Sequence, residues 1–510
     1  MKTLLVISFI VLSICSIAQT PDDALRTAWF SGNGTARNVA LGGAGASLGG
    51  DISAANINPA GIGIYKTSEW LFGGSVLINN NKLSYRGTDT SNNKSTSMLG
   101  TSGVVFAYQS NQPYSSWVSS ALSFSFNQLA NYNNRIQYSG FNNTSSFSEQ
   151  YLEELQRDGA DTNSALSNYI FGSSLAYRTY LIDTISGPGN SVQGFQSLVP
   201  LSTGVWQKYD AITSGGYNEL AIAYAGNSNN NFYLGGSIII PIINYKRQLT
   251  YSETDATTDT SNQFKSFTYK ENFTSKGAGI GLKIGLIYKP QDNWRIGLAF
   301  HTPQLISYKD EIRSQMTTNT ESYAGVKSES SDNLNNGQPG TRQYNITTPY
   351  RMIISGSYLF GSSSDVKEQH GFITGDIEYV NYKGARFKGL ENADQGTLDY
   401  LKQVNDAVKS YYKGNINVRL GGELKLNTFM IRLGTAYYGS PYSNSTIKAS
   451  SVLTTGGIGY RGHGMFIDLA LSHTMLTDAN FPYRLSDKPN TYSIQKTNTD
   501  NIVFTVGFKF

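Results

Sequence analysis

The sequence predicts an all-β protein: a 14-stranded antiparallel transmembrane β-barrel with an N-terminal plug and some helical loops. Three observations predict this class. They are an unusual composition, a recurring period-2 alternation of apolar and polar residues, and an aromatic residue at the end of the last alternating segment. Gly supplies 52 of 510 residues, charged residues only 15% and aromatic residues 12%. This composition excludes a disordered chain, and the net charge of +4 argues against a nucleic-acid-binding protein.

An export signal begins the chain. Residues 1–18 combine one basic residue, an apolar core from Leu4 to Ile14 and a small residue at the end, which is the pattern of a cleaved secretory signal peptide. A lipid-attachment box around Cys15 is the alternative, and Ile14 fits such a box poorly. Because Cys15 is the only cysteine, the mature chain has no thiol. Disulfides, a thiol nucleophile and a cysteine-ligated zinc site are therefore excluded.

Period-2 alternation is clearest at the C-terminus. One face carries Ile502, Phe504, Val506, Phe508 and Phe510, and the other carries Val503, Thr505, Gly507 and Lys509. The apolar face of many such segments ends in an aromatic residue, as expected for strands with lipid outside and a polar lumen inside. Strands in lipid must close into a barrel, because no water satisfies an open edge. A soluble β-sandwich is the alternative, but it does not need aromatic-ended apolar faces.

Fourteen segments show this strand character, an even number as single-chain bacterial barrels require. They span 69–79, 99–109, 117–130, 217–226, 230–246, 265–289, 293–308, 341–361, 369–384, 414–425, 428–439, 450–460, 463–475 and 492–510. Very short links at 227–229, 290–292, 427 and 461–462 are expected to be periplasmic turns. The long polar links are expected to be extracellular loops, and 3–4 spacing of apolar residues predicts helices within 147–183 and 391–412. Each helix is either a lid or a packed loop.

The lumen of such a wide barrel needs a filling, because larger barrels leave an open water channel. Residues 19–66, which precede the first strand, are rich in small residues, and glycines let one backbone approach another closely. We therefore expect three parts: a signal peptide at 1–18, a plug at 19–66 and the barrel at 67–510.

Four short motifs of the plug resemble the hatch of the FadL/TodX family, whose members are outer-membrane transporters for long-chain fatty acids and aromatic hydrocarbons. The motifs are Thr35-Ala36-Arg37, Gly42-Gly43-Ala44-Gly45, Gly49-Gly50-Asp51 and Asn58-Pro59-Ala60-Gly61. The resemblance implies a monomeric barrel in the outer membrane of a Gram-negative bacterium. It also implies that a hydrophobic ligand leaves sideways, through a kink in the third strand.

The last motif carries the best match. By the resemblance, Asn58, Pro59, Ala60 and Gly61 hold the hatch near the lateral opening. The alternative is a tight turn that leads into the first strand. The third strand, 117–130, departs from the family pattern, since it contains no Pro or Gly that would force a kink.

An apolar run gives separate support for hydrophobic cargo. Ile238, Ile239, Ile240, Pro241 and Ile243 belong to a segment that is apolar on both faces, so some of its side chains point inward. Pro241 also removes a donor from the strand ladder. These residues are a candidate ligand path, and the alternative is that they pack against the hatch.

Charged residues on the polar faces form rows of mixed sign: Lys283, Arg295, Arg419, Glu423, Lys425, Arg432 and Asp468. We expect them to join the hatch to the wall, and contact with a carboxylate headgroup is the alternative. An enzyme is not expected, because Ser472-His473 has no nucleophile elbow or placed carboxylate. The four histidines have no metal-binding spacing, so no metal and no cofactor are expected.

The expected function is passive uptake of hydrophobic small molecules. The expected partners are that ligand, outer-membrane lipid and the barrel-assembly machinery, which reads a terminal aromatic residue such as Phe510. Three alternatives stay open. They are an assembly or secretion partner for exported proteins, a haemin receptor that uses ligands such as His370 and His463, and an ordinary diffusion pore.

Overall fold

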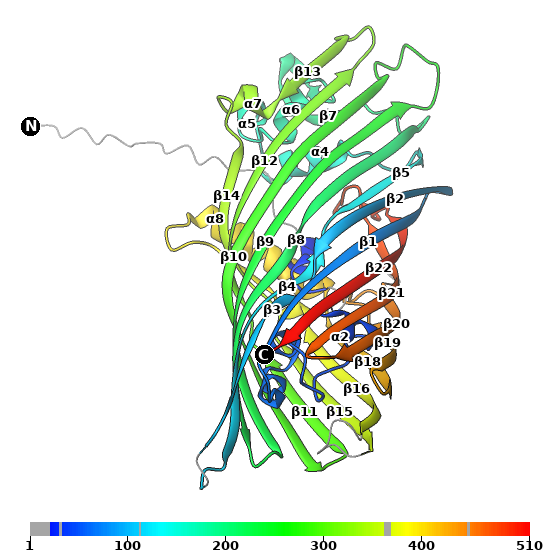
Figure 1. Ribbon diagram of the computed structural model, residues 1–510. Helices are drawn as coiled ribbons and strands as arrows, with labels where there is room; N and C mark the ends of the chain where they lie inside the picture. Colours follow the sequence, from blue (N-terminus) through cyan, green and yellow to red (C-terminus); the bar gives the residue numbers. More distant parts are fainter. Residues whose placement is uncertain (1–20, 30–32, 112–113, 362–368, 446–448) are drawn as a thin grey trace, which may run out of the picture.

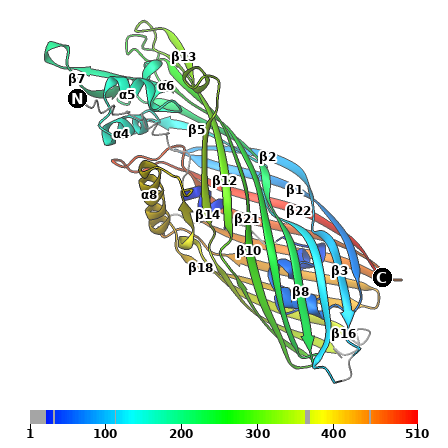
Figure 2. The ribbon, with the colours of Figure 1, turned by 90° about the vertical axis from the view of Figure 1, so that its left-hand side faces the viewer.

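The computed structural model describes residues 21–29, 33–111, 114–361, 369–445 and 449–510. The expected signal peptide and Cys15 lie outside the described residues. The described chain forms a closed antiparallel barrel (Figures 1 and 2). Its first strand, β1 (Glu69–Tyr85), pairs with its last, β22 (Ser493–Lys509), in one continuous ladder, and this pairing closes the wall.

The described wall has the fourteen strands that the sequence predicts, and five of them consist of two successive pieces. In order around the wall they are β1; β2 (Thr88–Leu99) with β3 (Ser102–Gln109); β4 (Trp117–Asn131) with β5 (Asn134–Asn142); β8 (Val205–Ser228); β9 (Phe232–Asp255); β10 (Ser266–Gln291); β11 (Trp294–His301) with β12 (Leu305–Asn319); β15 (Arg351–Gly361) with β14 (Gly340–Thr347); β16 (Gln369–Asn381) with β17 (Arg386–Lys388); β18 (Gly414–Leu426); β19 (Phe429–Tyr438); β20 (Ser450–Gly462); β21 (Met465–Asn480); and β22.

Buried and exposed side chains alternate along these strands, and the exposed set is apolar. Leu433 is 68% exposed and Ile354 59%. Exposed aromatic side chains gather near the C-terminal residue and the short turns: Trp70, Tyr108, Trp117, Phe232, Trp294, Tyr358, Phe429, Phe508 and Phe510. A contiguous exposed apolar surface of this kind needs a non-aqueous surrounding. We call it the apolar belt.

Several strands are longer than the alternation predicts. β8, β9 and β10 extend far beyond the belt, and in Figure 1 they form the tall green wall. Outward side chains on the extension of β9 are polar, as at Lys246, Gln248 and Thr250. The outward apolar pattern therefore ends at Ile242, although the hydrogen-bonded strand continues with apolar side chains on its inner face. The pieces β2 and β5 were not predicted for the same reason.

Helices and short strands cap the barrel end opposite the C-terminus (Figure 2). They are α4 (Glu149–Arg157), α5 (Thr162–Ser167), α6 (Ser173–Arg178), the hairpin β6 (Ile182–Ser186) and β7 (Val192–Ser197) with η2 (Pro188–Asn190), β13 (Val326–Ser330), α7 (Ser331–Leu334), η3 (Tyr382–Gly384) and α8 (Gln395–Tyr411). Helices thus occupy both segments in which 3–4 spacing predicts them. Within the described ranges, no helix combines the length and the apolar character that a membrane crossing needs.

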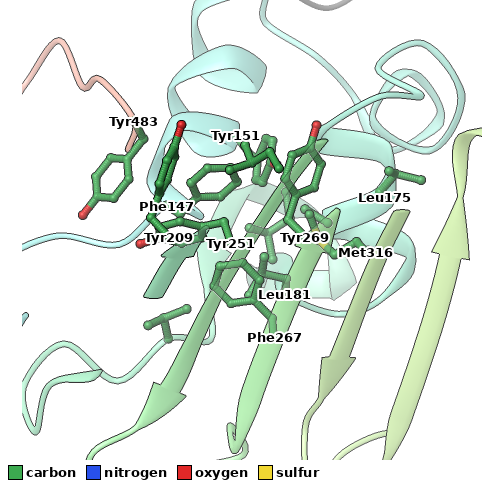
Figure 3. Packing of buried hydrophobic residues seen from close by; sticks show 14 of the residues in the cluster. Phe147, Tyr151, Leu175, Leu181, Tyr209, Tyr251, Phe267, Tyr269, Met316 and Tyr483 are labelled. Carbon is green, nitrogen blue, oxygen red and sulfur yellow. The ribbon is translucent and has the colours of Figure 1, made fainter. Parts of the chain in front are cut away.

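A large aromatic cluster fixes α4 and its neighbours to the inner side of the tall wall. Phe147 stacks on Tyr251 of β9 with ring centroids 4.4 Å apart, and it also contacts Phe267, Tyr269 and Tyr483 (Figure 3). Glu253 lies beside them, fully buried, and accepts hydrogen bonds from Ser146, Phe147, Gln207 and Tyr251. This end of the barrel is therefore a packed layer.

The N-terminal segment, by which we mean residues 21–66, contains α1 (Pro21–Arg26), α2 (Ala36–Ala40), α3 (Ala54–Ile57) and η1 (Pro59–Ile64). Strands surround it: α2 contacts β19 to β22, whereas η1 contacts β4, β8, β9 and β10. Almost all of its described side chains after residue 33 are buried. In both ribbon views the blue segment lies within the strands.

Candidate functional site

Wall glycines let the N-terminal segment reach the inner surface of the barrel. A Cβ on Gly235 of β9 would lie 2.6 Å from the Ala60 nitrogen, and a Cβ on Gly285 of β10 would lie 1.7 Å from Asn58 Oδ1. On the opposite side, a Cβ on Gly434 would lie 2.3 Å from the Gly42 nitrogen. Only glycine, which has no side chain, permits these contacts.

Asn58 joins three parts of the molecule. Its Nδ2 donates to the Ala46 oxygen at 2.6 Å and to the Leu286 oxygen of β10 at 3.1 Å, and its Oδ1 accepts from the Ala60 nitrogen at 3.2 Å. Asn58 thereby caps η1, in which Pro59 is the first residue. All four residues of the Asn-Pro-Ala-Gly motif are buried. These contacts fit the tight-turn alternative, and the motif's role at a lateral opening stays a prediction.

The inward charged residues pair with one another and with the N-terminal segment. Arg432, which is 1% exposed, contacts Glu423 at 2.6 Å and Asp468 at 2.7 Å. Lys283 pairs with Glu219 at 2.6 Å and donates to the Asn56 oxygen at 3.1 Å. Further links to the segment run from Asp376 to Gly45 and from Arg295 to Leu48. Lys283 and Arg295 thus join the N-terminal segment to the wall, whereas Arg432, Glu423 and Asp468 pair within the wall.

Arg37 extends the network from the N-terminal segment itself. Its Nε lies 3.6 Å from Glu423 Oε2, and it donates to the Gly50 oxygen. Burial by itself would lower the pKa of Arg37, but the carboxylates of Glu423, Asp51 and Asp468 outweigh burial and raise that pKa. Arg37 is therefore charged at every physiological pH and holds α2 against the wall.

A small polar cavity of about 90 Å³ lies beside this network. Asn56 and Asn38 line it together with Lys283, His301 and Arg419. Both polar side-chain atoms of Asn56 are buried without a hydrogen-bond partner among the described residues. A polar space of this kind suits ordered water.

A larger cavity of about 290 Å³ lies between the N-terminal segment and the wall. Its lining is mixed: apolar side chains come from Trp29, Val39, Leu77, Met98, Leu129, Leu453 and Leu476, and polar ones from Arg26, Asn33, Asn79, Asn131, Ser451, Ser472, Thr474, Thr499 and Asn501. Small-molecule sites combine apolar side chains with polar groups that fix the orientation of the ligand. None of these lining residues was among the predicted site residues. Apolar pairs such as Leu77-Ile78, Met98-Leu99 and Met475-Leu476 carry the same two-faced signal as the isoleucine run.

The wall contains a seam beside this cavity, which we define as the space between β2 (88–99) and β5 (134–142). No backbone ladder joins these two described strands: β2 pairs with β1, and β5 pairs with β8. Side chains bridge the seam instead. Thr90 Oγ1 of β2 donates to the Gln137 oxygen of β5 at 2.7 Å, and Asn81 Nδ2 of β1, the strand paired with β2, donates to Asn134 Oδ1 at 2.6 Å. Met98 and Leu129–Tyr132 line the large cavity, which therefore lies at the end of the seam nearer to β3 and β4.

The third wall strand is interrupted between Asn131 and Asn134, beside the seam, and the ladder between β3 and β4 already ends at Ser102 and Phe126. The Oδ1 of Asn131 accepts a hydrogen bond from the Asn133 nitrogen at 2.7 Å, a local bond of the kind that turns favour. Tyr132 donates from its hydroxyl to the Arg26 oxygen of α1 at 3.2 Å. The segment 117–130 contains no Pro or Gly, so the sequence did not predict an interruption. The interruption occurs at asparagines just beyond that segment.

The isoleucine run divides between the two faces of β9. Ile238 and Ile240 are 45% and 36% exposed and belong to the apolar belt, so they do not line the interior. Ile239, Pro241 and Ile243 are buried on the inner face, and a role for them in a ligand path stays a prediction. Ile239 packs with residues of α3 and η1, and Ile243 packs with residues of α1. The alternative that the inward residues pack against the N-terminal segment is therefore what the structure contains.

The other predicted residues are dispersed. Phe510 is 65% exposed on the outer side, where its ring contacts Phe106, and its role in assembly stays a prediction. His301 hydrogen-bonds the Ile57 oxygen, whereas His473 pairs with Asp500 on the outer face. No group of three or more potential metal ligands occurs in the part of the chain that the structure describes.

These features define a class of protein, a closed barrel that crosses a membrane with strands. Comparison with solved structures places its fold beside a Pseudomonas aeruginosa FadL homologue, at a TM-score of 0.54 and 12% identity over 95% of this chain and 100% of that chain. The Pseudomonas putida toluene transporter TodX (TM-score 0.48, 12% identity) and the Ralstonia pickettii toluene transporter TbuX (0.47, 14%) are also similar, each over 94% of this chain and 99% of its own. No protein-family model and no curated protein matches the sequence.

Proposed function

We propose that this protein takes up hydrophobic small molecules, such as long-chain fatty acids or aromatic hydrocarbons, passively across the outer membrane of a Gram-negative bacterium. The large cavity of about 290 Å³ at the seam carries the proposal, because apolar side chains line part of it at the place where no backbone ladder joins two wall strands. The fold it shares with a FadL homologue supports the same class.

In this proposal residues 1–18 are removed on export, residues 19–66 are a hatch and residues 67–510 form the barrel. The helix-bearing end faces outward, because long loops of such barrels are extracellular and short turns are periplasmic. Phe510 then lies at the periplasmic side, where the barrel-assembly machinery would recognise it. Because the proposed transport is passive, it involves no metal or cofactor, and in this proposal the protein acts as a monomer.

The proposed route runs from the outer end to the cavity and then sideways through the seam. A lateral exit suits a hydrophobic ligand because it leads directly to lipid and avoids an aqueous lumen. Met98 and Leu129 give the lower end of the seam an apolar lining, and Leu99 lies beside it on the outer face with 47% exposure. Separating the strands at the seam requires breaking only a few side-chain hydrogen bonds, which costs less free energy than breaking a backbone ladder.

Tyr132 supplies a coupling between hatch and seam. Its hydroxyl contacts the backbone of α1, and its ring packs edge-on against Tyr245, over which the Arg26 guanidinium lies at 3.7 Å. Movement of α1 when a ligand fills the cavity would therefore pull directly on the residue at which the third strand is interrupted.

A reversible disulfide tests this route, and the mature chain has no cysteine that would interfere. The variant Asn81→Cys/Asn134→Cys replaces side chains of β1 and β5 that touch beside the seam. We expect its oxidised form to lose uptake of a labelled fatty acid and of toluene, and reduction to restore it. The control Ser307→Cys/Asn345→Cys bridges β12 and β14, which are already joined by a ladder, and should transport equally in both forms.

Two outcomes would contradict the proposal. Uptake that is unchanged by oxidation of a confirmed Asn81→Cys/Asn134→Cys disulfide would exclude the seam as the exit. Cells without the protein that take up both compounds at the normal rate would exclude the transport function, and stable co-purification with an exported protein would then favour the secretion-partner alternative.

A further inference from the structure

Lysines cluster on the outer face of the wall just beyond the apolar belt. Lys246 lies on β9, Lys276 on β10 and Lys309 on β12, and all three are exposed. Strand register places them in neighbouring rows. Lys276 is directly opposite Lys309 on one side and opposite Asn244 on the other, and Lys246 is one row further along. We call these three residues the basic patch.

The apolar belt ends immediately below the basic patch. On the same three strands, Ile240, Ile280 and Leu305 form one outward row, and Ile242, Ala278 and Ser307 form the next. The row of Lys276 and Lys309 follows, two residues and about 7 Å beyond Ile242 and Ala278. The ammonium groups therefore lie at the height at which lipid headgroups meet the hydrocarbon edge.

The positive charge of the patch is only partly compensated. Lys309 contacts Glu311 at 2.7 Å, and Glu311 is the one carboxylate on the outer face of β9, β10 and β12 within these described rows. Directly opposed like charges on neighbouring strands repel each other. A bound anion between Lys276 and Lys309 would remove that repulsion, and Asn244, Thr274 and Gln343 add hydrogen-bonding groups around it.

We propose that the basic patch binds the phosphate group of a lipid in the outer leaflet. Three lysines and one glutamate have a net charge of +2, and a phosphate monoester carries nearly the opposite charge. Lysine binds phosphate as a compact point charge. The neighbouring belt rows would hold the acyl chains of the same molecule. This inference takes one point from the proposed function, namely the orientation in which the helix-bearing end of the barrel faces outward.

The test uses the full-length barrel in detergent and a short-chain phosphatidic acid, whose headgroup is a phosphate monoester. Native mass spectrometry measures the affinity. We expect the triple variant K246Q/K276Q/K309Q to bind about a hundredfold more weakly than wild type, since each lysine near an anionic lipid contributes about fivefold. Diacylglycerol, which lacks the phosphate, should bind both proteins equally weakly.

Two further variants control for charge and folding. K208Q/K270Q/K327Q removes the same charge from exposed positions on the same side of the barrel, far beyond the belt, and should bind like wild type. K246R/K276R/K309R keeps the charge and should retain binding. Equal affinity of wild type and K246Q/K276Q/K309Q would overturn the proposal, as would equal losses in the two glutamine variants.

Competition separates the lipid from its free anion. Inorganic phosphate that displaces phosphatidic acid at a similar concentration would show a free-phosphate site and overturn the commitment to lipid. The transport proposal fails separately. A wild-type protein that binds phosphatidic acid through the patch but takes up no hydrophobic compound would contradict transport alone.

Discussion

At the scale of single residues, contact between the N-terminal segment and the wall depends on the absence of side chains. Gly235 faces inward against the backbone of Pro59 and Ala60, whereas its neighbour Gly236 meets nothing closer than 3.9 Å. The two glycines are adjacent in sequence but lie on opposite faces of β9, so they form a natural matched pair.

We predict that Gly235→Ala destabilises the protein by about 1–3 kcal/mol, because its Cβ would overlap backbone atoms that cannot move independently. Gly236→Ala should stay within about 0.5 kcal/mol of wild type. Denaturant unfolding, followed by the gel mobility of the folded barrel, measures both. Equal midpoints for the two variants would show that the N-terminal segment is not held against β9 in solution.

At the scale of elements, the loop layer and the tall wall stabilise each other. The inner faces of β8, β9 and β10 beyond the belt are aromatic, and α4 to α6 cover them through the cluster around Phe147 (Figure 3). The barrel ladder does not depend on this cluster, since its hydrogen bonds run between strands. Loss of the cluster should therefore release the loops before the wall.

We predict that Phe147→Ala weakens this layer by about 3–5 kcal/mol, the usual cost of truncating a buried phenylalanine. Limited proteolysis should then cleave between residues 143 and 204 while the barrel remains intact. Ile185→Ala, at a position 39% exposed on β6, is the control and should resist cleavage like wild type. Cleavage that begins within the wall strands would instead show that the cluster stabilises the barrel itself.

At the scale of the whole molecule, the exposed apolar belt requires a hydrocarbon surrounding. Leu433, the most exposed leucine of the belt at 68%, should face acyl chains. Beyond the belt, Thr250 faces outward on the tall wall, where neighbouring side chains are polar.

We predict that Leu433→Arg lowers the stability of the barrel in a phospholipid bilayer by about 2–4 kcal/mol, as a charge on the lipid face does near the midplane. Thr250→Arg should change it by less than about 0.5 kcal/mol. Reversible unfolding from bilayers measures both values. A tolerated arginine at residue 433 would mean that this face contacts water or another protein.

The strand order and the interior could be predicted to different degrees. Each strand with an apolar outer face was found, because lipid on one side and a polar interior on the other impose a period of two, but β8, β9 and β12 extend about ten residues beyond the predicted ends. The strand 88–99 was missed because both of its faces are polar, and 134–142 was missed because only Ile136 and Tyr138 are apolar on its inner face and its outer face is largely polar. Asn58 stood out by its motif, but its three hydrogen bonds join residues 46, 60 and 286, which no local pattern relates.

The sequence by itself determined the number of strands, the outward apolar face and the small-residue segment that precedes the first strand, because each depends on neighbours along the chain. Only the tertiary structure decided that β2 and β5 do not pair, that Leu77, Met98, Leu129 and Leu476 share one cavity, and that three lysines share one patch. These features arise from registers between strands that are distant in sequence, and closure of the barrel sets those registers.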